Sequence, residues 1–216
     1  MLHANTMAKT VSRTGLMLLV AASVAVLLLA ASAGSAQAGG HHIRDLQGSV
    51  NLSIMKSGET IYYESPDKKK ISSVKSSNKK VLTVKLQKNG MLKLTKKKPG
   101  KAKVTYKLAG KKKTANVVLH KYQNPLKTFK IGSKDYAAKF NKRCEYYPSQ
   151  ITPGKLVVKP ARNWVVKQIY IAGDNHERRV KGEYMLNSEQ NYISVYLVNK
   201  KTKVEASVLL TSEHYD

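Results

Sequence analysis

The fold is decided by the stretch from Val74 to Leu119, which reads VKSSNKKVLTVKLQKNGMLKLTKKKPGKAKVTYKLAGKKKTANVVL. Apolar residues recur at every second position in it, for example from Ala102 to Leu108, where lysine and threonine fill the positions between. A period of two is typical of strands that bury one face. Turn signals separate these strands, at Lys88-Asn89-Gly90, Pro99-Gly100 and Ala109-Gly110. Strands of about six residues with no helical period between them predict an antiparallel sandwich or barrel.

Six features of the same stretch occur in a fixed order and at regular spacing. They are the Ser76-Ser77-Asn78 turn, Val81 and Val84, Gly90, the short strand after it, Gly100-Lys101-Ala102-Lys103-Val104-Thr105 and the closing Val117-Val118-Leu119. This pattern resembles the bacterial immunoglobulin-like domain of group 2, over roughly residues 48–121. Val74-Lys75 departs from it, because the family often has Trp before the turn. The resemblance implies a sandwich used as a stalk, spacer or adhesive module of exported proteins, without catalytic residues.

A second β-domain is expected after a linker near Tyr122-Gln123-Asn124-Pro125, where polar residues and a proline interrupt the alternation. Its strands show in the apolar run Val165–Ile171, in Ile193, Val195 and Leu197, and in Val204, Ala206, Val208 and Leu210, with Asn199-Lys200-Lys201-Thr202 as a hairpin loop. The predicted fold class is all-β, with two small antiparallel immunoglobulin-like sandwiches after an N-terminal signal helix. The predicted parts are a signal peptide (1–38), a flexible N-terminus (39–47), a lysine-rich first domain (48–122) and a second sandwich (123–216).

The N-terminus carries an export signal. Lys9 and Arg13 precede the uncharged stretch Gly15–Ala38, which ends in Ala36-Gln37-Ala38, so Ala36 and Ala38 form an A-x-A cleavage site. The alternative is an uncleaved anchor, because about 18 apolar residues can span a bilayer. Cleavage after Ala38 would release residues 39–216 as a secreted or cell-surface protein without a membrane span.

Charge is concentrated in the first domain. The chain has 39 Lys and Arg against 13 Asp and Glu, a net charge of +26, and its segment 68–134 holds 22 Lys but no Asp, Glu or Arg. Candidate partners are an anionic cell-envelope polymer, a glycan or a surface protein. The candidate polyanion-binding residues form four turn clusters, Lys68, Lys69 and Lys70; Lys79 and Lys80; Lys96, Lys97 and Lys98; and Lys111, Lys112 and Lys113.

The expected positions of the turns weaken the interpretation of these clusters as one binding site. Consecutive turns of a sandwich alternate between its two ends, so the clusters near 69 and 112 should lie opposite those near 79 and 97. The alternative is therefore that the lysines merely solvate turns and protect sheet edges. Sequence-specific nucleic-acid binding is disfavoured, because Arg for bidentate phosphate contacts is missing from the segment.

The remaining candidates each have a structural alternative. If cleavage follows Ala38, the new terminus Gly39-Gly40-His41 can hold Cu(II) or Ni(II) in a square plane, but it is also an ordinary flexible end. Cys144, the single cysteine, excludes an intramolecular disulfide and is expected to be buried. Trp164 is expected in the core, and the polar run from Asp174 to Glu177 is interpreted as a loop next to Gly173 rather than as an acid/base group.

The sequence favours a non-enzymatic binding or adhesion module. It contains no nucleophile elbow, zinc-protease motif, phosphate-binding loop or calcium loop, and nothing in it calls for a cofactor. The first domain would hold the protein against an anionic envelope, and the Tyr-rich second domain would carry any specific contact. The alternatives are a glycan-active hydrolase with its site in residues 135–216 and a purely structural spacer.

Overall fold

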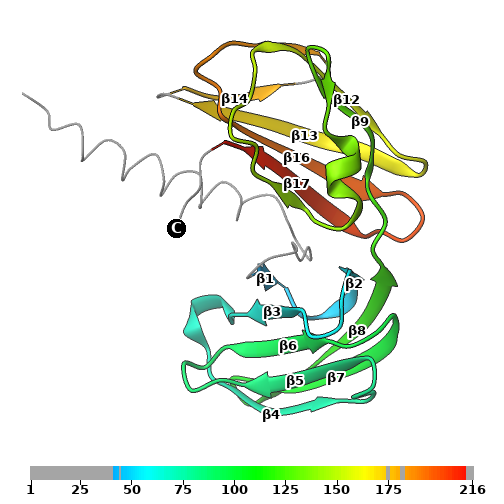
Figure 1. Ribbon diagram of the computed structural model, residues 1–216. Coiled ribbons are helices and arrows are strands. Elements are labelled where there is room, and N and C mark those ends of the chain that lie inside the picture. The colour runs from blue at the N-terminus through cyan, green and yellow to red at the C-terminus, as the bar shows by residue number, and fades with distance from the viewer. Residues whose placement is uncertain (1–40, 44, 174–175, 181–182, 213–216) are drawn as a thin grey trace, which may run out of the picture. The chain divides into compact units, whose positions relative to one another are not determined.

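The structure is a computed structural model that describes residues 41–43, 45–173, 176–180 and 183–212. The signal segment, its cleavage site at Ala36 and Ala38, and Gly39 and Gly40 lie outside the described residues. Strands and two short 3-10 helices make up the regular structure of the described part, and two separate hydrophobic cores divide it into two sandwiches (Figure 1). The predicted all-β class with two small sandwich domains is thus confirmed. Within the described residues, no helix is long and apolar enough to cross a bilayer.

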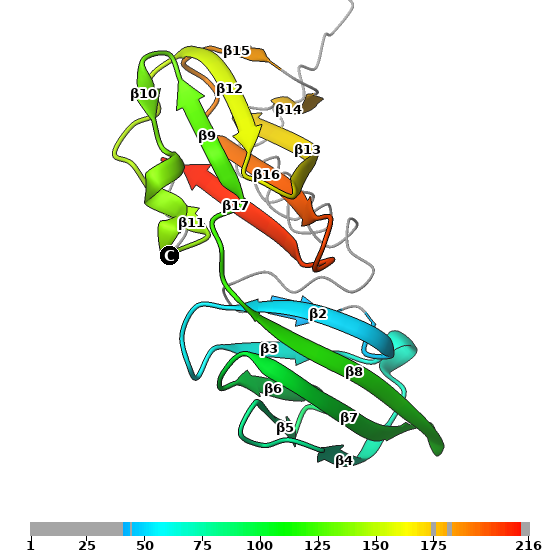
Figure 2. The ribbon, with the colours of Figure 1, turned by 90° about the vertical axis from the view of Figure 1, so that its right-hand side faces the viewer.

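The first domain is built from strands β1 to β8 in the immunoglobulin arrangement. Their order is β1-β3-β6-β5 in one sheet and β2-β8-β7-β4 in the other (Figure 2). β1 pairs parallel with β3 and β2 pairs parallel with β8, while the other neighbours are antiparallel. The elements are β1 (His41–Ile43), β2 (Gly48–Ile54), β3 (Thr60–Tyr63), η1 (Pro66–Lys68), β4 (Ile71–Ser76), β5 (Leu82–Leu86), β6 (Leu92–Lys96), β7 (Gly100–Leu108) and β8 (Lys111–Lys121).

The alternation along these strands builds the first core, because successive side chains of a strand point to opposite faces. Ala102, Val104 and Tyr106 of β7 are buried against Val117 and the other inward residues of both sheets. The rings of Tyr63 and Tyr106 meet edge to face, with centroids 5.7 Å apart. The Tyr106 hydroxyl donates to the Leu46 carbonyl oxygen at 2.9 Å, so this polar group is satisfied inside the core.

The segment before β2 belongs to the first domain, contrary to the prediction of a flexible N-terminus over residues 39–47. His41–Ile43 forms β1, Ile43 is buried, and Leu46 is 0% exposed. The sequence did not indicate this, since three residues are too few to show a period of two.

The predicted hairpin at Lys88-Asn89-Gly90 is confirmed, with a longer loop than a two-residue turn. β5 and β6 pair antiparallel up to Leu86 and Leu92, and the loop between them is closed by a hydrogen bond from Gln87 N to Met91 O at 2.8 Å. Gly90 supplies the positive φ of +83°. Asn89 contributes through its side chain instead, because its Oδ1 accepts a hydrogen bond from Met91 N at 3.2 Å.

The second domain is also a two-sheet sandwich, but one of its sheets has five strands. Its sheets have the orders β10-β9-β12-β15 and β11-β17-β16-β13-β14, and the short strand β11 pairs parallel with the last strand β17. The elements are β9 (Leu126–Ile131), β10 (Lys134–Asp135), η2 (Ala137–Asn141), β11 (Glu145–Tyr146), β12 (Gly154–Pro160), β13 (Trp164–Gly173), β14 (His176–Val180), β15 (Tyr184–Leu186), β16 (Tyr192–Asn199) and β17 (Glu205–Thr211).

The second core confirms the apolar faces predicted for the late strands. Phe140 of η2 stacks on Phe129 of β9 at 5.6 Å between centroids, and Trp164 is buried, as expected. The alternating sets of β16 and β17 are buried too, namely Ile193, Val195 and Leu197, and Ala206, Val208 and Leu210. The β16–β17 hairpin loop lies where predicted, with Asn199 N donating to Val204 O at 2.8 Å.

Candidate polyanion-binding surface

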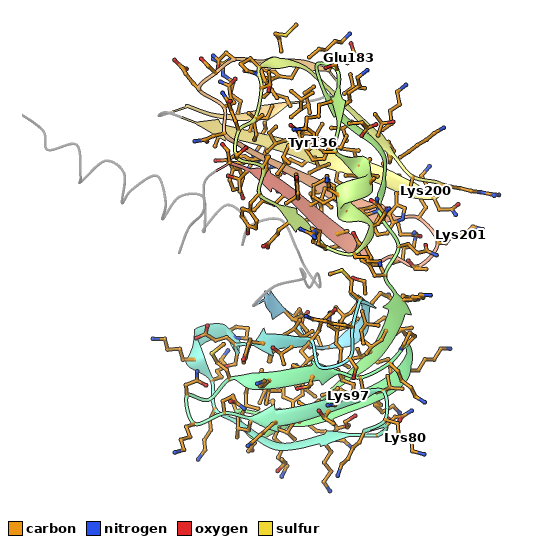
Figure 3. The ribbon with its side chains drawn as sticks, viewed as in Figure 1. Lys80, Lys97, Tyr136, Glu183, Lys200 and Lys201 are labelled. Atoms are coloured by element: carbon orange, nitrogen blue, oxygen red, sulfur yellow. The ribbon has the colours of Figure 1, made fainter. Side chains whose placement is uncertain are left out.

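The turn clusters of lysine lie at two ends of the first domain, as the alternation of turns predicted. Lys70 O accepts a hydrogen bond from Ala109 N at 2.9 Å, which places the 68–70 cluster beside the β7–β8 turn and its cluster 111–113. Lys97 N donates to Val81 O at 2.9 Å, which joins the clusters 79–80 and 96–98 at the other end (Figure 3). The four clusters therefore do not form one patch.

Lys96 is a structural residue, and its prediction as a polyanion contact is wrong. The side chain is 3% exposed, its Nζ lies 2.7 Å from Glu59 Oε2, and it donates to Ser53 O at 2.7 Å. Glu59 Oε1 in turn accepts hydrogen bonds from the main-chain amides of Met55 and Lys56. Lys96 continues the inward positions Leu92 and Leu94 of β6, so the strand directs it inward. Because Lys96 is followed by two more lysines, the sequence did not show that it shares the inward face with Leu92 and Leu94.

Lys113 is also partly withdrawn from the surface. It is half-buried, pairs with Tyr106 across the ladder, and donates to Gln47 Oε1 at 3.3 Å. Its neighbour Lys112 is exposed on the opposite face of β8. Members of one cluster therefore face different sides of the sheet.

The largest ordered array of lysines lies on the outer face of the β2-β8-β7-β4 sheet. Three of its members, Lys101, Lys103 and Lys107, alternate with buried residues along β7. Lys112 is the cross-strand partner of Lys107 on β8, and Lys75 of β4 pairs with the outward Thr105 of β7. All five side chains are exposed. We call this set the lysine face: Lys75, Lys101, Lys103, Lys107 and Lys112.

The neighbours of these lysines are uncharged and mostly polar, with the apolar Val118 of β8 opposite Lys101. The same face carries Ser49 and Asn51 of β2, Thr114 and Asn116 of β8, and Thr105 of β7. None of the residues that the registers place on this face is acidic, and no described acidic side chain pairs with its five lysines. Lys107 and Lys112 stand directly opposite each other, an arrangement that destabilises an antiparallel pair.

His120 is the titratable neutral group of the same sheet face. Its Nε2 lies 3.2 Å from Asn51 Oδ1 across the parallel β2–β8 pair. Burial lowers the pKa of His120 below its usual value, so the imidazole is neutral at pH 7. The positive charge of the face at pH 7 therefore comes from lysine alone.

The lysine face was not predicted from the sequence, because none of its five lysines is adjacent in sequence to another. The usable signal was the period of two, since Lys101, Lys103 and Lys107 occupy the outward positions between Ala102, Val104 and Tyr106. Lys112 was predicted as a contact within a turn cluster, and the register places it beside Lys107 instead. Lys75 could not be assigned a face from the sequence, because the register of β4 shifts between Ser72 and Lys75.

The corresponding face of the second domain carries tyrosine where the first carries lysine. Tyr170 of β13 and Tyr192 of β16 meet edge to face with centroids 6.0 Å apart, and they are 9% and 7% exposed. On the neighbouring strands β16 and β17, Ser194 Oγ lies 3.1 Å from Ser207 Oγ. These side chains form an ordered polar and aromatic layer rather than an exposed aromatic strip.

Cations of the second domain contact tyrosine rings around η2. Lys139 Nζ lies 5.2 Å from the ring centroid of Tyr146, and the Arg143 guanidinium lies 5.9 Å from the same ring. Lys134 Nζ lies 5.2 Å from the ring of Tyr136, a residue that packs in the core. Both rings belong to the second core or pack against it, so these contacts have a structural role.

The other predicted sites are placed as follows. Cys144 is buried as expected, and burial raises the pKa of its thiol to about 11, which keeps it protonated and unreactive. His176 and Glu177 lie in β14, where they pair with Gly173 and Ala172 of β13, so the predicted loop does not include them; Asp174 and Asn175 lie outside the described residues. Of the proposed copper or nickel site, only His41, the first residue of β1, is described. The described residues contain no group of three or more His, Cys, Asp or Glu that could hold a metal ion.

Comparisons with known proteins show similarity to solved structures but assign no function to this chain. No protein-family model matches the chain, and no curated protein sequence matches it. Among solved structures, domains 4–9 of the surface layer protein SbsC are 11% identical over 77% of this chain and 30% of that chain, with a TM-score of 0.29. The tandem Ig repeats of Dlar are 12% identical over 81% of this chain and 93% of that chain, with a TM-score of 0.28.

A third structure is a C-terminal fragment of intimin in complex with the intimin-binding domain of its translocated receptor. It is 12% identical over 68% of this chain and 53% of that chain, with a TM-score of 0.21. This chain covers less than a third of the SbsC fragment named above. The assignment of both domains as sandwiches rests on their own strand order and register.

Proposed function

We propose that this chain is an exported, non-enzymatic binding module that holds an anionic polymer or glycan of the cell envelope through its first domain. The observation that supports this most directly is the lysine face, an array of five exposed lysines on one face of a sheet without a described acidic partner. Such an array concentrates positive potential over one surface and attracts polyanions from solution. The turn clusters at both ends of the domain extend the attraction without focusing it.

Export is part of the proposal and rests on the N-terminal sequence. A charged segment, an apolar stretch and the Ala36-Gln37-Ala38 site stand in the order of a secretory signal. The first described strand begins at His41, three residues after Ala38, so cleavage after Ala38 leaves every described residue in the mature chain. In this proposal the protein is secreted or associated with the cell surface, and the second domain supplies any specific contact with a glycan or surface protein.

The proposal is tested by retention of the chain 39–216 on immobilised polymers over a salt series. Cell-wall polyanions, an acidic glycan and an uncharged dextran of similar size serve as surfaces. We expect retention on the polyanions at 50 mM salt, loss of retention as salt rises, and no retention on dextran, because charge pairing with a polyanion releases counterions. Absence of retention on every polyanion at low salt would overturn the proposal and leave the spacer alternative.

A further inference from the structure

We infer that the lysine face binds a linear polyol-phosphate chain that lies along strand β7. This inference rests on the proposed function and names the chemistry of its ligand and the residues that hold it. The five members of the lysine face carry it, whereas the turn clusters contribute only general attraction. Three geometric and chemical observations lead to this assignment.

The first observation is the spacing of positive charge. Residues two apart on a strand lie about 6.6 Å apart. Lys101 and Lys103 are separated by one such step, and Lys103 and Lys107 by two steps, with the outward Thr105 at the step between them. A bound linear chain therefore meets a cation at the first, second and fourth positions of a regular repeat. Lys112 and Lys75 on the adjacent strands β8 and β4 provide cations on both sides of this row.

The repeat of a polyol phosphate fits that spacing. A three-carbon polyol joins successive phosphorus atoms through six bonds, and three bonds of extended chain reach about 3.8 Å, as between consecutive Cα atoms. Six bonds therefore reach about 7 Å, close to the step between alternate residues of a strand. Each lysine stem is flexible, so the ammonium groups adjust to the remaining difference.

The second observation is the type of side chain on the face. Every cation on it is lysine, which pairs with phosphate as a compact point charge. The rows Lys101–Lys107 and Lys112–Val118 carry no outward Arg, Phe, Tyr or Trp that could stack on a base. Thr105 lies between Lys103 and Lys107 on β7, Asn116 is the cross-strand partner of Lys103, and Thr114 is that of Thr105, whereas the partner of Lys101 is the apolar Val118. Hydroxyl and amide groups such as these hydrogen-bond polyol hydroxyls. The face therefore favours a phosphate polymer without bases.

The third observation is the unfavourable pair of Lys107 and Lys112. These two residues are directly opposed on adjacent antiparallel strands, and no described acidic side chain lies between them in an ion pair. A phosphate bound between both ammonium groups replaces their repulsion by two attractions. The free protein is then less stable than it could be, and the polymer-bound protein regains that stability.

The test is a binding titration of the chain 39–216 with poly(glycerol phosphate) oligomers at several salt concentrations. Each phosphate contact contributes about 0.7 to the slope of log affinity against log salt for a flexible single chain, so five lysines give a slope of about −3.5. Affinity should then fall about 100-fold between 50 and 200 mM salt. The face variant Lys101→Gln, Lys103→Gln and Lys107→Gln should reduce the slope to about −1.4, a fall of about sevenfold over the same range.

A matched control removes the same charge from turns. The turn variant Lys79→Gln, Lys80→Gln and Lys98→Gln changes three exposed lysines outside the lysine face and should keep the slope near −3.5. Circular dichroism and thermal unfolding verify that both variants fold. Backbone amide shifts on addition of the polymer should cluster on β7 and β8 in the unaltered chain.

The outcomes of these experiments test the lysine face, the polyol-phosphate ligand and the proposed function separately. Equal loss of affinity in the face and turn variants would overturn the inference and leave diffuse polyanion binding as proposed. Equal or tighter binding of an oligodeoxynucleotide or a polyuronate with the same number of charges would overturn the polyol-phosphate assignment. Failure to bind any of the three polymers would overturn both the inference and the proposed function.

Discussion

The two domains present different residues on the corresponding face of a similar sheet. In both, an earlier strand pairs parallel with the last strand, the seven-residue β2 with β8 and the two-residue β11 with β17, and the remaining pairs of that sheet are antiparallel. The outward positions of this sheet carry lysine in the first domain. In the second domain they include Tyr170 and Tyr192, which pack against each other and are nearly buried.

The difference shows how this architecture separates fold from surface chemistry. Inward positions of the strands are apolar in both domains and build the cores. Outward positions are not needed for the core, so their residues can serve other purposes. In the second domain they form a stabilising layer, whereas in the first they keep like charges close together at a cost in stability. Four predictions probe this contrast.

The largest effect is expected for Lys96→Met, which changes the one described lysine of the first domain that is both buried and ion-paired. Its loss leaves the Glu59 carboxylate largely buried without its cation, and removing one partner of a buried pair costs about 3 kcal/mol. Urea unfolding of the chain 39–216 measures the change. The exposed Lys98→Met is the matched control and should leave the unfolding midpoint unchanged. Equal stability of both variants would show that Lys96 is merely another surface lysine.

A smaller loss of stability is expected for Tyr106→Phe, because this change removes only the hydroxyl of a tyrosine buried in the first core. The change removes the donor to the Leu46 carbonyl oxygen, and an unsatisfied buried acceptor costs about 1.5 kcal/mol. Tyr184→Phe in the second domain, where no hydrogen bond of the hydroxyl is described, is the control and should leave the denaturant midpoint unchanged. Hydrogen exchange should also become faster in residues 41–47. Unchanged exchange there would contradict the role of Tyr106 in holding this segment.

The sequence predicted well which residues of each strand are buried, but it predicted poorly which surface the outward residues form. A period of two identifies buried positions such as Val104 and Leu197, because burial selects apolar residues whatever the partner strand is. The lysine face depends instead on which strands become neighbours, and register follows from the whole sheet. Runs such as Lys96-Lys97-Lys98 misled for the same reason, since Lys96 has an inward position and the other two do not.

The third prediction tests whether the lysine face costs stability. Lys107→Glu should stabilise the chain by about 0.5 kcal/mol, because it turns the like-charge pair with Lys112 into an attractive cross-strand pair. The same variant should retain polyanions less well than the unaltered chain. Lys88→Glu, in the exposed β5–β6 loop, makes the same change of net charge away from the lysine face and is the control. If both variants change stability equally, the gain comes from lower net charge and not from the pair.

The smallest effect is expected at His120, the titratable neutral group on the lysine-rich sheet. Because burial lowers its pKa in the folded state, the unfolded chain takes up a proton first as pH falls. Its contribution to stability is therefore complete above the unfolded pKa of about 6.5 and is lost as pH falls through the lower folded pKa. Denaturant midpoints measured between pH 8 and pH 5 should fall less steeply for His120→Gln than for the unaltered chain. Identical pH profiles would show that His120 is solvated in the folded protein, and its protonation would then add to the charge of the face already near pH 6.5.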